Sequence, residues 1–123
     1  MLRTFLRAKL HRAAVTSADP DYEGSISIDR ALCREAGLLE FEQVDVYDIN
    51  NGARFTTYVI YGVPGQIQIN GAAARLVKVG DLVIICAYMA LEVGEIAAHT
   101  ARIVQVGADN KVIKAHTNAV HQP

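Results

Sequence analysis

The sequence has little charge and no clear excess of either sign. Charged residues make up 20% of the 123 residues, and 12 basic against 13 acidic side chains give a formal net charge of −1. A protein that binds nucleic acid or an anionic membrane surface through its overall field carries a marked positive excess. We therefore expect no nucleic-acid partner and no membrane partner.

Long apolar runs and patterned cysteines are also missing. The longest apolar run, Leu82–Leu91, is much shorter than the roughly 18 residues of a membrane-spanning helix. Basic residues interrupt the first twelve positions, where a signal peptide would need an apolar core. Cys33 and Cys86 have no partner at metal-binding spacing, which is typical of a reduced compartment. These features predict a cytoplasmic protein.

No repeat, low-complexity tract or linker divides the chain, so residues 1–123 are expected to form one domain. Hydrophobic residues make up 51% of the sequence, which is enough to form a buried core. A small domain with this composition commonly buries further surface in an oligomer.

Short strand-like segments dominate the pattern. Strands are predicted at residues 5–15, 43–49, 55–61, 66–70, 82–90, 102–106 and 112–115. A tight turn is expected at Asn50–Gly52, and one short helix over Ile28–Ala36 with Gly37 as its C-terminal cap. Residues 16–25 are expected to form a loop and residues 116–123 a frayed tail. Many short strands with little helix predict a mainly β fold closed into a small barrel, because closure removes edge strands.

The tripeptide Glu23-Gly24-Ser25, in the predicted loop, is suited to a self-cleavage reaction. A serine hydroxyl can attack the carbonyl carbon of the preceding residue and convert the peptide bond into an ester. A glycine before the serine leaves this approach open. Elimination from the ester cuts the chain and leaves dehydroalanine, which hydrolyses to a pyruvoyl group, an electrophilic carbonyl that acts as an electron sink. Taken alone, however, Gly-Ser in a loop is typical of an ordinary turn.

Six short segments give this tripeptide more weight. They are Lys9–Arg12, Tyr22–Ser25, Asn51–Gly52, Arg54–Tyr58, Asn70–Ala74 and Val79–Ile85. Their order and spacing resemble the pyruvoyl-dependent aspartate 1-decarboxylases over about the first 90 residues. The resemblance implies a double-psi β-barrel and self-cleavage between Gly24 and Ser25, giving a beta chain 1–24 and an alpha chain 25–123. It also implies a homotetramer, a possible maturation factor, and conversion of L-aspartate to β-alanine and CO2 for pantothenate synthesis.

The same resemblance implies roles for individual residues. Ser25 would become the pyruvoyl group, and Tyr58 would return a proton to the substrate carbon after CO2 leaves. Thr57 would hydrogen-bond the oxyanion of the acyl shift and later help to hold the substrate. Lys9 and Arg54 would bind substrate carboxylates. The remaining residues have supporting roles: Gly24 and Asn70 in processing, Gly71, Ala72 and Ala73 through their backbone, and His11 and Tyr22 as walls of the site.

Other interpretations of the same residues remain open. Thr57 and Tyr58 are adjacent, so on a regular strand they point to opposite faces, and serving one site requires a bulge, a strand end or a subunit boundary. A related enzyme could act on glutamate, and a non-catalytic barrel could carry Gly24-Ser25 as a plain turn.

His99, His116 and His121 lack metal-ligand spacing, and no glycine-rich phosphate loop is present, so neither a metal nor a nucleotide is expected.

Overall fold

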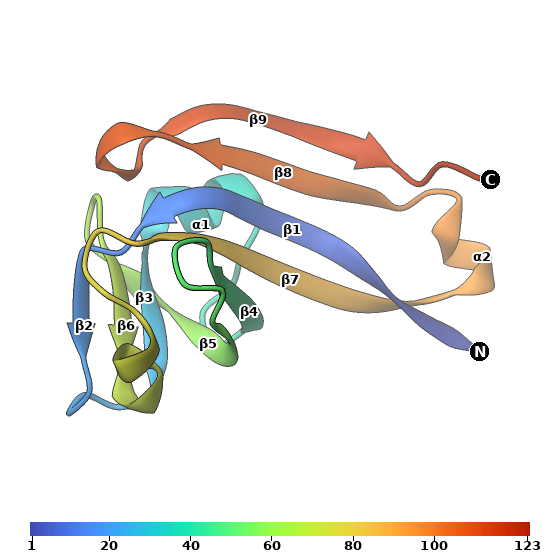
Figure 1. Ribbon diagram of the computed structural model, residues 1–123. Coiled ribbons are helices and arrows are strands. Elements are labelled where there is room, and N and C mark those ends of the chain that lie inside the picture. Colours follow the sequence, from blue (N-terminus) through green and yellow to red (C-terminus); the bar gives the residue numbers. More distant parts are fainter.

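The computed structural model describes residues 1–123 as nine strands and four short helices (Figure 1). The strands are β1 (Leu2–Ala14), β2 (Ser17–Asp19), β3 (Ser25–Asp29), β4 (Gln43–Asp48), β5 (Arg54–Gly62), β6 (Ile67–Asn70), β7 (Leu82–Glu92), β8 (Thr100–Val106) and β9 (Val112–Ala119). The α-helices are α1 (Arg30–Ala36) and α2 (Val93–Ile96), and the 3-10 helices are η1 (Gly71–Leu76) and η2 (Ala108–Asn110). The predicted mainly β architecture is confirmed.

The strands form one mixed sheet that closes on itself through β1 and β2. Strand order is β2-β6-β3-β5-β4-β7-β1-β8-β9. Only Val15 and Thr16 separate β1 from β2, and their amides donate to the carbonyls of Asp81 (2.9 Å) and Ile67 (2.8 Å). The same stretch of backbone therefore pairs with β7 at one end and with β6 at the other. This closure makes the small barrel that the sequence predicts.

The core lies inside the barrel and consists of aliphatic side chains at alternate strand positions. Leu10, Ile26, Ile28, Val59 and Ile69 are completely buried. One face of each strand thus supplies the core, which leaves the other face free for polar residues.

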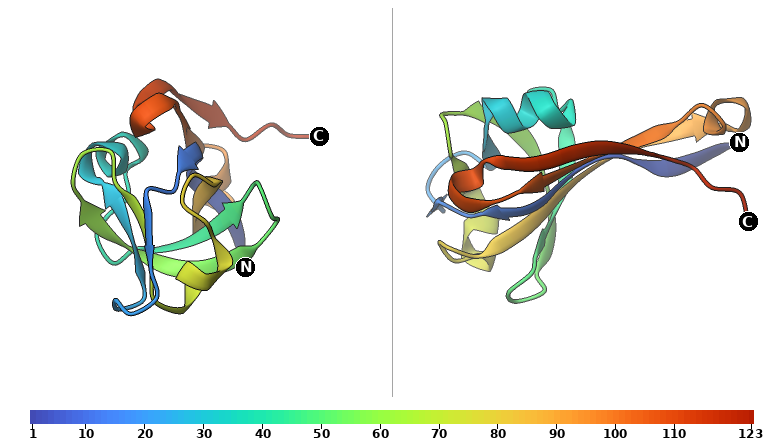
Figure 2. Two further views of the ribbon diagram at one scale, coloured as in Figure 1. Left: turned by 60° about the vertical axis from the view of Figure 1, so that its left-hand side comes forward. Right: turned by 90° about the horizontal axis from the view of Figure 1, so that it is seen from above.

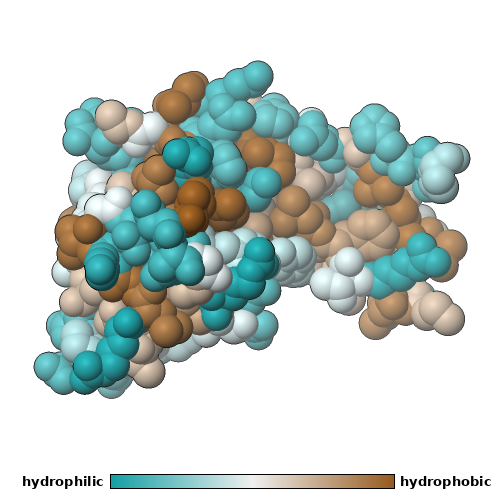
Figure 3. Space-filling model, viewed as in Figure 1, coloured by the Kyte–Doolittle hydropathy of each residue, from teal (hydrophilic) through white to brown (hydrophobic).

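An arm extends from the barrel. It contains the N-terminal part of β1, the C-terminal part of β7, helix α2, the start of β8 and the end of β9, while the β8–β9 hairpin turn lies over the barrel, as Figures 1 and 2 show. Apolar residues form patches on both the barrel and the arm in Figure 3. On the arm, Leu2 and Val93 are exposed. The arm is anchored to the barrel because β1 and β7 pair along their whole length.

Three sequence expectations needed correction. Helix α1 begins at Arg30 rather than Ile28, because Ile28 pairs with Tyr61 and Ile67 in the sheet and the Asp29 side chain caps the helix. Residues 16–25 are not wholly loop, since they contain β2 and the first residue of β3. The prediction of a frayed tail is wrong for residues 116–119, because β9 pairs with β8 from Val112 to Ala119. Besides the one helix that the sequence indicates clearly, the chain forms α2, η1 and η2, in agreement with the expected small barrel with one or more short helices.

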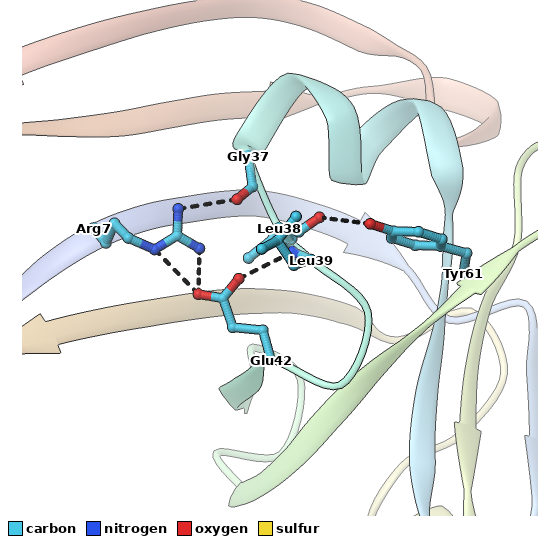
Figure 4. Close-up of polar contacts among 6 residues, drawn as sticks. All are labelled: Arg7, Gly37, Leu38, Leu39, Glu42 and Tyr61. Atoms are coloured by element: carbon cyan, nitrogen blue, oxygen red, sulfur yellow. Dashed lines mark hydrogen bonds and ion pairs between the residues drawn. The ribbon is translucent and has the colours of Figure 1, made fainter.

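The loop between α1 and β4 is fixed to the barrel by polar contacts (Figure 4). Arg7 on β1 donates to the Glu42 carboxylate and to the carbonyl of Gly37. The other oxygen of Glu42 accepts the backbone N–H of Leu39 (3.0 Å). This network holds Phe41 beside Tyr58, with 6.2 Å between ring centroids.

Candidate active site

Ser25 is the first residue of β3 and lies between two neighbouring strands. It pairs with Asn70 in the antiparallel ladder to β6, and on the other side the parallel ladder to β5 begins at Ile26 and Val59. The alternation from Ser25 to Ile28 places both isoleucines in the core and both serines on the opposite face. Ser25 is nevertheless only 2% exposed. Its hydroxyl is therefore a buried polar group that requires hydrogen-bond partners.

The Ser25 hydroxyl is held by two hydrogen bonds. Its Oγ donates to the carbonyl oxygen of Glu23 (3.0 Å) and accepts from Asn70 Nδ2 (3.0 Å). Asn70 Nδ2 also lies 3.2 Å from Ser27 Oγ, and Asn70 Oδ1 accepts from Gln68 Nε2 (2.7 Å). Since Gln68 occupies the acceptor end of the amide, the donor end of Asn70 points toward Ser25.

Gly71 packs directly against the residue before Ser25. Its φ of +76° lies in the left-handed region, and a Cβ at this position would lie 2.6 Å from Gly24 Cα. Any other residue at 71 would push the Gly24–Ser25 peptide out of place. Gly24 itself has no such restriction, because its φ is not positive and a Cβ there would meet nothing within 4 Å.

Helix η1 follows Asn70 directly and begins with Gly71, Ala72 and Ala73, of which Gly71 lies against Gly24. The first N–H groups of a helix have no partner within it, so they are available to an acceptor. Tyr22 precedes this peptide in the loop and has an exposed side chain. The fold thus brings together Ser25, Gly24, Asn70 and the start of η1.

Tyr58 and Thr57 approach this region from β5 on opposite faces. Extending the parallel register of Ile26 and Val59 by one residue places Tyr58 level with Ser25, and extending it by two places Thr57 level with Gly24. Tyr58 shares the outer face with Ser25 and is 37% exposed. Thr57 shares the inner face with Val59 and is half-buried. Both residues therefore lie just before the point on β5 where pairing with β3 begins.

Lys9, His11 and Arg54 lie elsewhere on the outer face. Arg54 is four residues from Tyr58, roughly 13 Å along the strand. Lys9 and His11 lie on β1, which is separated from β3 by β5, β4 and β7. One chain does not bring Lys9 or His11 to Ser25.

The cations of this outer face have no carboxylate partner. The ion pairs of the chain join Met1 to Glu92, Arg7 to Glu42 and Arg102 to Glu35, and none involves Lys9 or Arg54. Arg54 and the residues beside it line a cleft of about 290 Å³. Asp45 also lines this cleft, but its carboxylate accepts the Thr56 hydroxyl (2.7 Å) and forms no ion pair with Arg54. An anion can therefore approach Arg54 without displacing an ion-paired carboxylate.

Burial and nearby positive charge keep His11 neutral. Desolvation, followed by the charges of Lys9 and Arg12, lowers the pKa of His11 below its usual 6.5. Its Nδ1 is buried without a hydrogen-bond partner. The imidazole therefore adds no positive charge to this face at neutral pH.

Both cysteines are buried and free. Burial raises the pKa of Cys33 to about 12 and also raises that of Cys86, so neither side chain ionises readily at neutral pH. No group of three or more His, Cys, Asp or Glu side chains is arranged to hold a metal ion. None of the helices has the length and apolar character needed to cross a membrane.

Comparison with known sequences adds independent information to this geometry. The family model described as Aspartate decarboxylase matches residues 1–113. The chain belongs to the aspartate decarboxylase family.

Three relatives, each named aspartate 1-decarboxylase, illustrate how much of the chain this similarity covers. The protein from Methylibium petroleiphilum is 53% identical and covers 91% of this chain and 95% of its own length. The protein from Bdellovibrio bacteriovorus is 56% identical and covers 89% of this chain and 88% of its own length. The protein from Corynebacterium efficiens is 53% identical and covers 97% of this chain and 89% of its own length. The similarity therefore includes the region beyond residue 91, where the sequence motifs give no indication.

The aspartate decarboxylase motifs did not indicate two features of this site. Gln68 orients the Asn70 amide. The alternation of Gln66, Gln68 and Asn70, from the residue before β6 to its end, indicates this role because it places three polar side chains on one face. Tyr47 and Tyr88 hydrogen-bond each other at 2.7 Å. No local pattern indicates this pair, because it depends on the pairing of β4 with β7.

Proposed function

We propose that this chain is a self-processing enzyme that removes CO2 from L-aspartate to give β-alanine for pantothenate synthesis. The single observation that carries the proposal is the environment of Ser25. A buried serine hydroxyl is held between the Glu23 carbonyl and the Asn70 amide, with Gly71 packed against Gly24. An ordinary turn needs none of these restrictions. We also place the activity in the cytoplasm, because two free, buried cysteines suit a reduced compartment.

Cleavage begins with a bond between Ser25 Oγ and the carbonyl carbon of Gly24. The Gly24–Ser25 amide bond breaks, which leaves an ester and a free amine on Ser25. Elimination then breaks the Cβ–Oγ bond of Ser25 and releases Gly24 as a carboxylate. Hydrolysis of the dehydroalanine releases ammonia and leaves a pyruvoyl group at residue 25. The products are chains 1–24 and 25–123.

Asn70 and Thr57 have separate tasks in this cleavage. Asn70 Nδ2 lies 3.0 Å from Ser25 Oγ and holds the hydroxyl oxygen next to its own preceding peptide. Thr57 lies level with Gly24 on the inner face, where its hydroxyl is suited to donate to the oxygen that becomes negatively charged during the acyl shift.

The surroundings of Ser25 fit a pyruvoyl group. The residue is buried between two strands, beside the donor on Asn70. The group's carbonyl supplies an electron sink when CO2 is lost from a bound amino acid. Tyr58 is level with residue 25 on the same face and is the proposed proton donor to the substrate carbon. A phenolic hydroxyl can donate a proton, as this role requires.

Substrate binding requires cations near residue 25, and this requirement favours an assembly. Lys9 and Arg54 have no carboxylate partner, yet Lys9 is separated from β3 by three strands in its own chain. We propose that a second copy places its cationic face over Ser25, in a homo-oligomer that we expect to be a tetramer. His11 and Tyr22 would then form walls of the shared site, and Gly71, Ala72 and Ala73 would provide its backbone contacts. The pyruvoyl group is the cofactor, and a maturation factor could assist the cleavage.

The test is the mass of the purified protein under denaturing conditions, followed by an assay for β-alanine. We expect two fragments that separate at Gly24 and Ser25, the second carrying pyruvoyl at its first position, and β-alanine formation from L-aspartate. Ser25→Ala should fold, remain uncut and lack activity. Fragments that appear only after cell extract is added would identify a maturation factor. An intact chain that forms no β-alanine with extract would contradict the proposal, and turnover of L-glutamate instead would correct the substrate.

A further inference from the structure

Two tyrosines on the outer face are joined through their hydroxyl groups. Tyr47 lies on β4 and Tyr88 on β7, on either side of the Asp45–Cys86 pair in the ladder. Their side chains lean toward each other across this pair, and the two hydroxyl oxygens are 2.7 Å apart. A hydrogen bond of this length fixes both rings at the tip, where a tyrosine is otherwise free to move.

The Tyr47 ring in turn contacts Arg54. Tyr47 and Arg54 are direct neighbours in the antiparallel ladder of β4 and β5. The guanidinium carbon of Arg54 lies 4.3 Å from the centre of the Tyr47 ring, within the range of a cation–π contact. Since Arg54 forms no ion pair, the ring is a principal support for a guanidinium at the surface.

We propose that Tyr88 is a positioning residue for substrate recognition: its hydroxyl fixes the Tyr47 ring, and that ring holds the Arg54 guanidinium in the orientation that binds a substrate carboxylate. The inference rests on the proposed function, in which Arg54 binds a carboxylate of aspartate. It assigns the hydroxyl pair a role beyond packing, because an arginine already held in place loses less side-chain entropy when it binds an anion.

The uncharged state of the Tyr88 hydroxyl supports this role. The hydrogen bond to Tyr47, together with burial, raises the pKa of Tyr88 well above that of a free phenol. The Tyr88 hydroxyl therefore remains uncharged over the physiological range and keeps its hydrogen bond to Tyr47.

The first test compares steady-state kinetics of Tyr88→Phe and Tyr47→Phe. Each variant keeps the ring and loses the hydrogen bond. We expect KM for aspartate to rise roughly threefold to tenfold, with kcat and the extent of chain cleavage unchanged. Because one hydrogen bond is removed in either case, the double variant should be no worse than either single variant. Tyr47→Leu, which removes the ring, should raise KM further.

Tyr61→Phe is the matched control. Its ring also lies beneath an arginine, with Arg30 at 5.0 Å, and its hydroxyl also has a hydrogen-bond partner, the carbonyl of Leu38. This pair lies away from Arg54, so KM should not change. Unchanged KM in Tyr88→Phe, or additive effects in the double variant, would overturn the inference.

A second measurement does not depend on activity. In the uncut Ser25→Ala protein, the Nε–H signal of Arg54 in an NMR spectrum should be shifted by the Tyr47 ring. This signal should move toward its free position in Tyr88→Phe but not in Tyr61→Phe. A signal unaffected by Tyr88→Phe would contradict the inference even with an active enzyme. A wild-type protein that makes no β-alanine would instead refute the proposed function.

Discussion

Thr57 and Tyr58 are adjacent in the sequence but lie on opposite faces of β5. Tyr58 is on the outer face and Thr57 is on the inner face, one and two residues before Val59, where pairing with β3 begins. No bulge interrupts β5 in its pairing with β4, so the two side chains cannot turn to the same face. In the proposed function, cleavage is therefore assisted from the inner face by Thr57 and turnover from the outer face by Tyr58.

This separation predicts different defects for the two residues. Thr57→Val keeps the shape of the side chain and removes its donor, so cleavage should slow while the fold is kept. Tyr58→Phe should be cut at the normal rate and lose about 100-fold or more of its turnover, since only the proton donor is removed. Fragment formation over time and β-alanine produced per cut subunit separate these effects. Normal cleavage in Thr57→Val would refute its oxyanion role.

At the scale of elements, the short helix η2 joins three parts of the chain through Asn110. This buried side chain accepts from the amide of Ala14 and donates to the carbonyls of Ala14 and Gly65. It thereby connects the β8–β9 hairpin with the end of β1 and with the β5–β6 turn. Asp109, its neighbour, shares the left-handed backbone conformation but is exposed.

Asn110→Ala should lower the free energy of unfolding by about 3 kcal/mol, and Asp109→Ala by about 1 kcal/mol. Both changes place alanine at a positive φ, but only the first leaves buried backbone groups without partners. Urea unfolding of both variants in the Ser25→Ala background, at one protein concentration, measures the difference. Equal losses would show that backbone conformation alone accounts for the effect.

Elements whose signals are local could be predicted from the sequence. The β4–β5 hairpin is confirmed because Gly52 adopts the positive φ of its turn, and the end of α1 because Gly37 adopts that of a C-terminal cap. The start of α1 was missed because Ile28 is held by β5 and β6, which come later in the chain. The end of β9 was missed because it pairs only with β8 and its side chains are mostly exposed.

The periodicity of the sequence predicts the strands but not which residues meet at the site. Asn70 meets Ser25 across a sequence separation of 45 residues, and nothing in the periodicity of β3 or β6 specifies this pairing. The motifs that resemble a known family indicated both residues. The structure explains how Gly71 and Gln68 support Ser25 and Asn70. The catalytic roles of Ser25 and Asn70 stay predictions.

At the scale of the whole molecule, the proposed site is divided between copies of the chain. A mixture of two inactive subunits tests this directly. Ser25→Ala retains Lys9, and Lys9→Ala retains Ser25. In a co-expressed assembly, up to about a quarter of the sites should combine both intact residues, if the two subunits mix at random in a closed oligomer. Recovery of β-alanine formation is the expected result, with each variant expressed alone as the control. No recovery in a mixed oligomer would mean that each chain completes its own site.

The position of β1 has a consequence for the mature form. This strand lies between β7 and β8, and its residues Leu10 and Ala13 are completely buried in the core. Cleavage after Gly24 would release the whole of β1 from the covalent chain while leaving it inside the sheet. The processed subunit would then be a heterodimer, and its two pieces would separate on unfolding. By mass action, the stability of the cut subunit would fall on dilution. The cleavage that creates the pyruvoyl group would therefore also make refolding a second-order reaction between two chains.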